Sequence, residues 1–388
     1  MVLVTRLAIC GSLISLSPLV TAAQEASRYP DVHPNGRLQL DAVVYRDDRK
    51  DLSNGTEVRR ARLALLGALA ERWTFQLEAD FSDNEIKVSD AWVLYHASPA
   101  VRVQLGNFKE PFSLEAVTSS RFITFLERSL ADAFVDSRNI GAAVRAYFAP
   151  ISLTVGAFGQ DPGELGDSEL GDSEGWSLDL RATAAPILTD RALLHLGGAL
   201  RHRTPDARAG GGDRARFRTY SESHLERTRF LDTGPIAGVT AHDQLGLEAA
   251  VVYGPWSLQA ERIFTAIRSQ VGDDPVLSGA YAYISWVITG ESRVYVPATG
   301  VFMQPVPRRA AGAVELAARY STVDLNDGAV AGGAGTNWTL AANWYANESV
   351  RISANYVITD HDLLADANGT QAGDDDFSAL QLRIGFFF

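Results

Sequence analysis

Residues 73–82 read WTFQLEADFS, and apolar and polar side chains alternate along this stretch without exception. Successive side chains of a β-strand point to opposite faces, so the stretch predicts a strand with one apolar and one polar face. The apolar face carries Trp73, Phe75, Leu77, Ala79 and Phe81, and the polar face carries Thr74, Gln76, Glu78, Asp80 and Ser82. A tilted strand of about ten residues spans a bilayer, whereas soluble strands cluster near five or six. A soluble sandwich also alternates, but this length favours a membrane strand.

The same alternation returns near the C-terminal end, in residues 337–344, 350–358 and 380–388. The last segment runs to Phe386, Phe387 and Phe388, and such a terminal aromatic resembles the mark by which bacterial outer-membrane barrels are recognised for assembly. Aromatic residues also stand beside tight turns, as in an interfacial girdle: Trp73, Tyr253, Trp256, Trp344 and Tyr345. After residue 23 no stretch approaches the roughly 18 apolar residues of a membrane helix. The membrane class that fits is therefore a β-barrel.

The turns predict sixteen strands, near residues 36–46, 57–69, 72–82, 88–97, 100–106, 140–148, 151–159, 175–184, 191–202, 243–253, 256–266, 279–290, 310–320, 336–345, 349–359 and 377–388. Most connections that follow even-numbered strands are short, and those that follow odd-numbered strands are long, as in outer-membrane barrels. Residues 214–222 also alternate, but a strand there would break this order, so we place them inside one loop at 203–242. The predicted fold class is all-β, a transmembrane antiparallel barrel.

The first 23 residues predict a secretory signal peptide. Arg6 precedes an apolar stretch at 7–19, and small residues, Thr21, Ala22 and Ala23, stand where a peptidase would cut. Residues 24–388 then form a single barrel domain. The only cysteine, Cys10, lies inside the signal, so the mature chain is expected to hold neither disulfides nor a cysteine-ligated metal.

The charge of the chain is −12, which makes nucleic acid a poor partner. Of 35 basic residues only Lys50, Lys87 and Lys109 are lysines. A GC-rich genome explains the total count of arginines, so a functional role must be argued from the positions of individual arginines. The seven histidines are scattered singly: His33, His96, His195, His202, His224, His242 and His361. None forms a motif with serine or a metal-ligand spacing, so we expect no enzyme, no catalytic residue, no cofactor and no metal site.

Several segments, in order along the chain, resemble the phosphate-selective porin O and P family of Gram-negative outer membranes. They are GRLQLD at 36–41, RRAR at 59–62, LGNFKEPF at 105–112, ERS at 127–129, RNIG at 138–141 and ELAARY at 315–320. The resemblance implies a homotrimer in the outer membrane, with lipid and lipopolysaccharide around it. It also implies sixteen-stranded barrels in which two external loops and a periplasmic turn fold into each lumen. The insertions at 107–139, 203–242 and 291–309 match those three segments.

The resemblance also implies a basic constriction. Arg59 and Arg60 match a consecutive pair of the family, and Arg121, which follows TSS at 118–120, falls where a phosphate-specific member has a basic residue. Strict alternation prevents Arg59 and Arg60 from both facing the lumen unless a β-bulge intervenes.

The loop at 203–242 is basic in its own right. Between 201 and 229 it has eight arginines against four acidic residues. Arg214, Arg216 and Arg218 alternate with smaller or apolar residues, so in an extended segment all three project to one side. Such a row offers planar donor forks to phosphate oxygens. The alternatives are a solvated basic loop, a loop bound to lipopolysaccharide phosphates, or a mixture of these roles.

The function predicted from these features is passive diffusion of anions, phosphate or polyphosphate among them, through an arginine-lined constriction. The alternative is a general or differently selective porin, because Glu78 and Asp80 should also face the lumen. There they either fasten inserted loops to arginines or weaken anion preference. Two acidic runs, at 161–174 and 360–376, either hold divalent cations that bridge lipopolysaccharide or are simply solvated.

Overall fold

The computed structural model describes residues 29–388 except 48, 83–84, 136–137, 160–173 and 207–213. The predicted signal peptide and nearly all of the first acidic run lie outside the described residues. Within the described part of the chain, no helix combines the length and the apolar character needed to cross a membrane.

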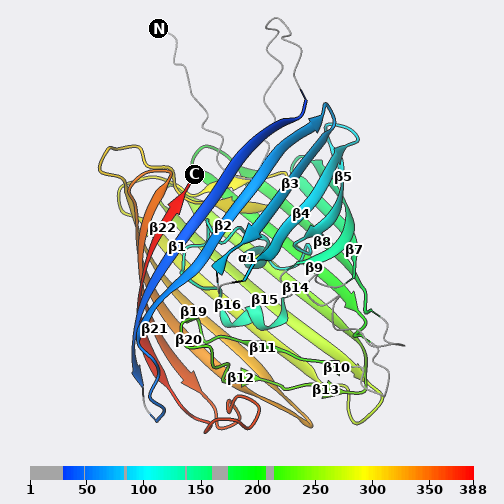
Figure 1. Ribbon diagram of the computed structural model, residues 1–388, viewed down its shortest axis with the longest axis vertical. Helices are drawn as coiled ribbons and strands as arrows, with labels where there is room; N and C mark the ends of the chain where they lie inside the picture. The colour runs from blue at the N-terminus through cyan, green and yellow to red at the C-terminus, as the bar shows by residue number, and fades with distance from the viewer. Residues whose placement is uncertain (1–28, 48, 83–84, 136–137, 160–173, 207–213) are drawn as a thin grey trace, which may run out of the picture.

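Sixteen antiparallel strands close into a barrel (Figure 1). They are β1 (Asp31–Asp47), β2 (Gly55–Ala70), β3 (Trp73–Asp80), β4 (Lys87–His96), β5 (Val101–Phe108), β6 (Asn139–Phe148), β7 (Ile151–Phe158), β8 (Ser177–Leu188), β9 (Ala192–Arg203), β14 (Val239–Tyr253), β15 (Trp256–Ser269), β16 (Val276–Val287), β19 (Ala313–Asp327), β20 (Val330–Tyr345), β21 (Val350–His361) and β22 (Phe377–Phe387). The barrel closes where β1 pairs with β22, from Arg37 opposite Phe387 to Asp47 opposite Phe377. Each of the sixteen predicted strands overlaps one of these, so the predicted fold class is confirmed.

The two ends of the barrel differ in the length of their connections. Residues 71–72, 149–150 and 254–255 make tight turns at the end where β1 begins and β22 ends (Figure 1). The connections at 109–138 and 204–238 leave the opposite end. In outer-membrane barrels the short turns face the periplasm. We call these the short-turn end and the long-loop end.

The three long insertions fold into the barrel, as expected. The first, 109–138, carries α1 (Leu114–Val117) and η2 (Leu130–Phe134), and Figure 1 shows α1 within the ring of strands. The second, 204–238, carries the paired strands β10 (Arg214–Ala215) with β13 (Ile236–Ala237), and β11 (Arg218–Thr219) with β12 (Leu231–Asp232). The third, at the short-turn end, carries β17 (Val294–Val296) and β18 (Val301–Met303). Residues 214–222 therefore lie in a loop and not in the barrel wall, as predicted.

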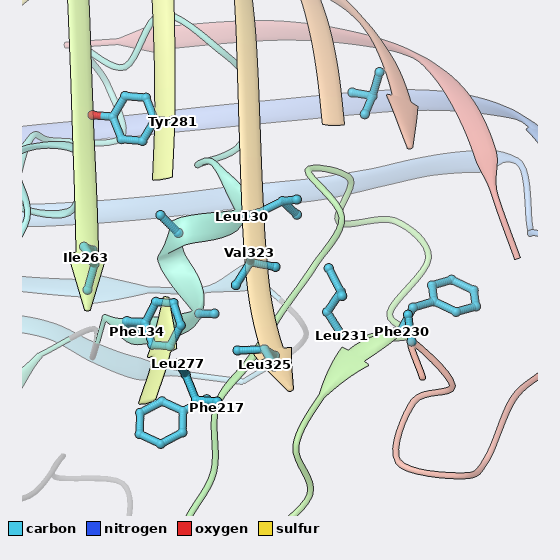
Figure 2. Close-up of a cluster of buried hydrophobic side chains, with 14 of the residues drawn as sticks. Leu130, Phe134, Phe217, Phe230, Leu231, Ile263, Leu277, Tyr281, Val323 and Leu325 are labelled. Atoms are coloured by element: carbon cyan, nitrogen blue, oxygen red, sulfur yellow. The ribbon is translucent and has the colours of Figure 1, made fainter. Parts of the chain in front are cut away.

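Alternation sorts the wall into an apolar outside and a polar inside. Outward side chains such as Leu77, Leu258 and Leu340 are about half exposed, whereas the inward Asn337 and Thr339 are fully buried. Burial inside the barrel is possible because the loops fill it with their own apolar side chains. Figure 2 shows this cluster, in which η2 and the second insertion meet the wall: Leu130, Phe134, Phe217, Phe230, Leu231, Ile263, Leu277, Val323 and Leu325.

Candidate functional site

Arg59 and Arg60 lie at a β-bulge in β2. Gln39 of β1 pairs with Arg60 and the next residue pairs with Val58, so Arg59 is an extra residue in the ladder. A bulge re-aims side chains that strict alternation would send to opposite faces. As a result both arginines reach one carboxylate: Arg59 donates two hydrogen bonds of 2.8 Å to Glu127, and Nη2 of Arg60 lies 3.6 Å from Oε2 of Glu127.

A third arginine completes this clamp around Glu127. Nη2 of Arg383, on β22, donates to Oε1 of Glu127 at 2.7 Å and also binds Asp41 of β1. Burial by itself raises the pKa of Glu127, but the charges of Arg59, Arg60 and Arg383 outweigh burial and hold that pKa well below its usual range. Glu127 therefore stays ionised and fastens the first insertion to the wall.

Arg121 has different surroundings. It is buried, with its guanidinium carbon 4.7 Å from the centre of the Phe387 ring, and Nη2 donates to the carbonyl oxygen of Glu348 at 3.2 Å. Glu348 belongs to the turn between β20 and β21, at the short-turn end. Arg121 thus contacts the last strand and a turn, whereas Arg59 and Arg60 contact the loop carboxylate.

Exposure alternates along residues 214–219. Arg214, Arg216 and Arg218 are exposed, and the three residues between and after them are buried, so the guanidinium groups share one side of the segment. Arg216 binds Asp232 through two hydrogen bonds of 2.7 and 2.5 Å. Partial desolvation within the loop, together with the neighbouring charges of Arg229 and Arg216, lowers the pKa of Arg218. The three predicted arginines of this segment therefore lie together at the long-loop end, apart from the Glu127 clamp.

Two of these arginines open onto a basic recess of about 410 Å³. Its charged lining residues are Arg216, Arg218, Arg227, Arg229 and Asp232. Ala367, Asn368, Thr370 and Gln371 of the last long loop also line the recess. We call this the long-loop recess.

A second charged cluster supports the expectation that inward acidic residues fasten loops. Glu78 accepts from Arg37 at 2.7 Å and from Arg62 at 3.1 Å, and Arg62 also binds Asp80. Arg37 in turn donates to the hydroxyls of Ser119 and Ser120 in the first insertion. Strand phase pointed to Glu78 and Asp80, but their arginine partners were not predicted.

Arg319 is the residue that the sequence reasoning missed most clearly. It is fully buried on β19, where Nη1 binds Glu115 of the first insertion at 3.0 Å and Nη2 binds Glu222 of the second at 2.5 Å. One wall arginine therefore holds both loops. The sequence did contain a signal for this role, because Arg319 lies on the polar face of a predicted strand, in phase with Glu315.

The second acidic run is engaged by the connection between β1 and β2. Asp374 binds the side chain of Arg49 at 2.8 Å, and Asp375 accepts from the backbone N–H of Arg49 at 3.0 Å. Among the residues the structure describes, no group of three or more His, Cys, Asp or Glu side chains is arranged to hold a metal ion.

Residues 32–388 match the model of the phosphate-selective porin O and P family. The chain belongs to this family. It is 29% identical over 393 residues to Porin O of Pseudomonas aeruginosa, an alignment that covers 89% of this chain and 86% of that protein. It is also 32% identical to an uncharacterized protein of Caulobacter vibrioides, covering 84% of this chain and 68% of the relative. The predicted family is confirmed, and the protein is an outer-membrane porin.

Solved porins share the barrel at lower identity. An anion-selective porin from Comamonas acidovorans is similar with a TM-score of 0.57 at 14% identity, covering 92% of this chain and 99% of that one. The trimer form of OmpT from Vibrio cholerae gives 0.55 at 12% identity, with the same two shares covered. These likenesses show the fold of this phosphate-selective porin O and P family member and support the closed barrel described above.

Proposed function

We propose that this porin passes small anions, phosphate or polyphosphate among them, by passive diffusion through an arginine-lined constriction. The observation that carries the proposal is the long-loop recess, which has four arginines and one aspartate in a chain of net charge −12. A concave surface lined by one sign of charge raises the local concentration of the opposite ion. Anions would therefore collect at this mouth although the molecule as a whole is acidic.

The recess is suited to transient binding. Arg229 donates to the hydroxyl of Tyr220 at 3.2 Å and lies over its ring, and in the described residues no carboxylate pairs with Arg218. Such planar guanidinium groups offer two parallel donors to one oxyanion. Arg216 keeps Asp232, which limits how tightly an anion is held. A channel needs binding strong enough for entry and weak enough for release.

Arg59, Arg60 and Arg121 have a second role in the proposal. The Glu127 clamp joins three arginines to two carboxylates, Glu127 and Asp41, so one positive charge is left over. This surplus supports a constriction that favours anions, with Arg121 as a further cation of the first insertion. The pairing of these arginines with Glu127 and Asp41 also supports the alternative, a general or differently selective porin. That alternative predicts larger conductance and no saturation by phosphate.

The proposal also covers export, assembly and membrane contacts. We infer that residues 1–23 are removed as a signal peptide, that three copies assemble, and that the apolar outer wall meets lipid and lipopolysaccharide. OmpT of Vibrio cholerae is described in a trimer form, which supports a trimer here. We also infer that the protein acts as a channel and carries out no catalysis.

Single-channel recordings in a planar bilayer test the function. The zero-current potential in a chloride gradient should show anion preference, and added phosphate should block chloride current in a saturable way. The double substitution Arg216→Gln and Arg218→Gln should weaken that block. Arg268→Gln is the matched control, because Arg268 lies at the same end but on the exposed outside, paired with Asp243 at 2.6 Å. Cation preference without phosphate block would overturn the proposal.

A further inference from the structure

An arginine pair faces the lumen near the short-turn end. Arg102 of β5 lies directly opposite Arg145 of β6. Arg102 is in phase with buried Gln104, and Arg145 is in phase with buried Ala143, whereas the neighbouring Val144 is exposed on the outer wall. Because strand side chains alternate, both guanidinium groups belong to the inner face. We call Arg102 and Arg145 the inner arginine pair.

The inner arginine pair places like charges side by side. Directly opposite residues on antiparallel strands have Cβ atoms about 5 Å apart, and like charges there repel. Within the described ranges, no hydrogen bond or ion pair joins either guanidinium to another residue, and Nε of Arg145 is buried without a partner. Eight other inward arginines bind a carboxylate: Arg37, Arg59, Arg62, Arg138, Arg181, Arg201, Arg319 and Arg383. Arg351 instead fills its donors with hydroxyl, carbonyl and amide oxygens, so it too differs from the inner arginine pair.

The neighbours leave the pair without a carboxylate of its own, because Asp90, whose charge acts on Arg145, is already bound to Arg138 at 3.0 Å. The next residues in the same row are Thr154 of β7, opposite Arg145, and Arg181 of β8, opposite Thr154. Arg181 is already bound to Glu248 at 2.7 Å, and its remaining donors reach the carbonyl oxygens of residues 299 and 300. On the other side of the row Arg102 lies opposite His96 of β4, and Arg145 lies 5.9 Å from the centre of the Phe108 ring. The row therefore combines the uncompensated positive charge of the inner arginine pair with the hydroxyl of Thr154 and the apolar ring of Phe108.

We propose that Arg102 and Arg145, with the hydroxyl of Thr154, form a second anion station whose ligand is an inorganic oxyanion of the phosphate class. The station rests on the proposed function, since it deepens the same anion path. A divalent tetrahedral oxyanion takes hydrogen bonds from two guanidinium groups at once and relieves their repulsion. Chloride has a single charge and no separate oxygen atoms, so it offsets less of the repulsion and does not offer a separate acceptor oxygen to each guanidinium group.

The position of the station assigns it to one side of the channel. The inner arginine pair lies close to the turns at 97–100 and 149–150, whereas the long-loop recess lies at the opposite end. An anion arriving from the short-turn end meets the pair first. The pair should therefore control the capture rate from that side and leave capture from the long-loop side to the recess.

One-sided addition of inorganic phosphate to the full channel in a bilayer tests this. Replacing both residues, Arg102→Gln and Arg145→Gln, should lower the association rate of phosphate from the short-turn chamber by about tenfold and leave the rate from the other chamber unchanged. Arg262→Gln is the matched control, because this exposed arginine stands on the outer wall opposite exposed Leu247. The single change Arg102→Gln replaces the double variant if the latter does not assemble.

The outcomes separate the two proposals. An unchanged short-turn rate in a variant that still shows block from the long-loop side overturns the station alone. Absence of phosphate block in the unmodified channel from both chambers overturns the proposed function and the station with it. Thermal unfolding gives an independent reading: added inorganic phosphate should raise the Tm of the unmodified protein by more than the Tm of the double variant. Equal increases would overturn the station.

Discussion

Glu127 shows at the scale of one residue how this lumen is held in shape. Three wall arginines bind it, and removing one partner of a buried charged set costs about 3–5 kcal/mol because the others remain uncompensated. We expect Glu127→Gln to lower the free energy of unfolding by about that amount. It should also strengthen anion preference, since three guanidinium groups lose a counter-charge. Thermal unfolding in detergent and the zero-current potential measure the two effects.

An exposed carboxylate gives the matched control for Glu127. Asp243 lies on the outer wall, paired with Arg268 and His202, and its side chain is 38% exposed. Exposed pairs contribute only about 0–1 kcal/mol, so Asp243→Asn should leave both measurements nearly unchanged. Equal losses of stability in Glu127→Gln and Asp243→Asn would contradict the structural role of the clamp.

The lowered pKa of Glu127 predicts how the clamp responds to acid. A carboxyl group with a depressed pKa stabilises the folded state fully above its unfolded pKa, about 4.3, and loses that contribution as pH falls toward the folded pKa. The Tm difference between the unmodified protein and Glu127→Gln should therefore be constant from pH 7 to about 5 and shrink below about 4. A difference that is already halved at pH 6 would rule out the depressed pKa.

At the scale of elements, the strands were the part of the fold that sequence alone could predict. Alternation is a local property, so residues 73–82 or 350–358 showed their faces directly. Strand ends were less predictable: β20 begins at Val330, six residues before the expected start, in a glycine-rich stretch that gives little alternation. A Cβ on Gly332 would lie 2.8 Å from atoms of Thr233, so the second insertion packs against that backbone.

The candidate site was predictable only in part, for a related reason. The family resemblance pointed to Arg59 and Arg60, and strict alternation indicated the need for a bulge, which the β1–β2 register shows. Which carboxylate pairs with which arginine depends on how an inserted loop packs against the wall. That packing brings together segments that are far apart in the chain. Arg319 with Glu222 joins residues 97 positions apart, and no spacing in the sequence indicates that pair.

The 3₁₀ element η2 provides a prediction at the same scale. Leu130 is fully buried in the apolar cluster inside the barrel, and Leu→Ala at such a site costs about 2–5 kcal/mol through lost burial and the cavity left behind. We expect Leu130→Ala to lower Tm and to make single-channel current noisier as the first insertion loosens. Leu258→Ala, on the half-exposed outer face, is the control. A Tm loss as large for Leu258→Ala would mean that the cluster does not anchor the loop.

The whole molecule separates its charges by location. The chain carries −12 overall, yet arginines line the long-loop recess and the inner wall. Acidic residues on the inside mostly act as fasteners, since Glu78, Glu115, Glu127 and Glu222 each bind wall arginines. The electrostatic potential inside the channel is therefore set by the arginines that have no carboxylate partner, and not by the net charge of the chain.

This separation predicts how phosphate capture depends on salt. Attraction across the mouth of the long-loop recess is screened beyond a Debye length of about 10 Å at 0.1 M salt and about 3 Å at 1 M. The association rate of phosphate from the long-loop chamber should fall steeply between these concentrations in the unmodified channel. The double variant Arg216→Gln and Arg218→Gln should start lower and fall less, while Arg268→Gln should follow the unmodified curve. Parallel curves for the unmodified channel and the double variant would mean that the recess does not steer anions, because removing two of its charges must reduce any field that it produces.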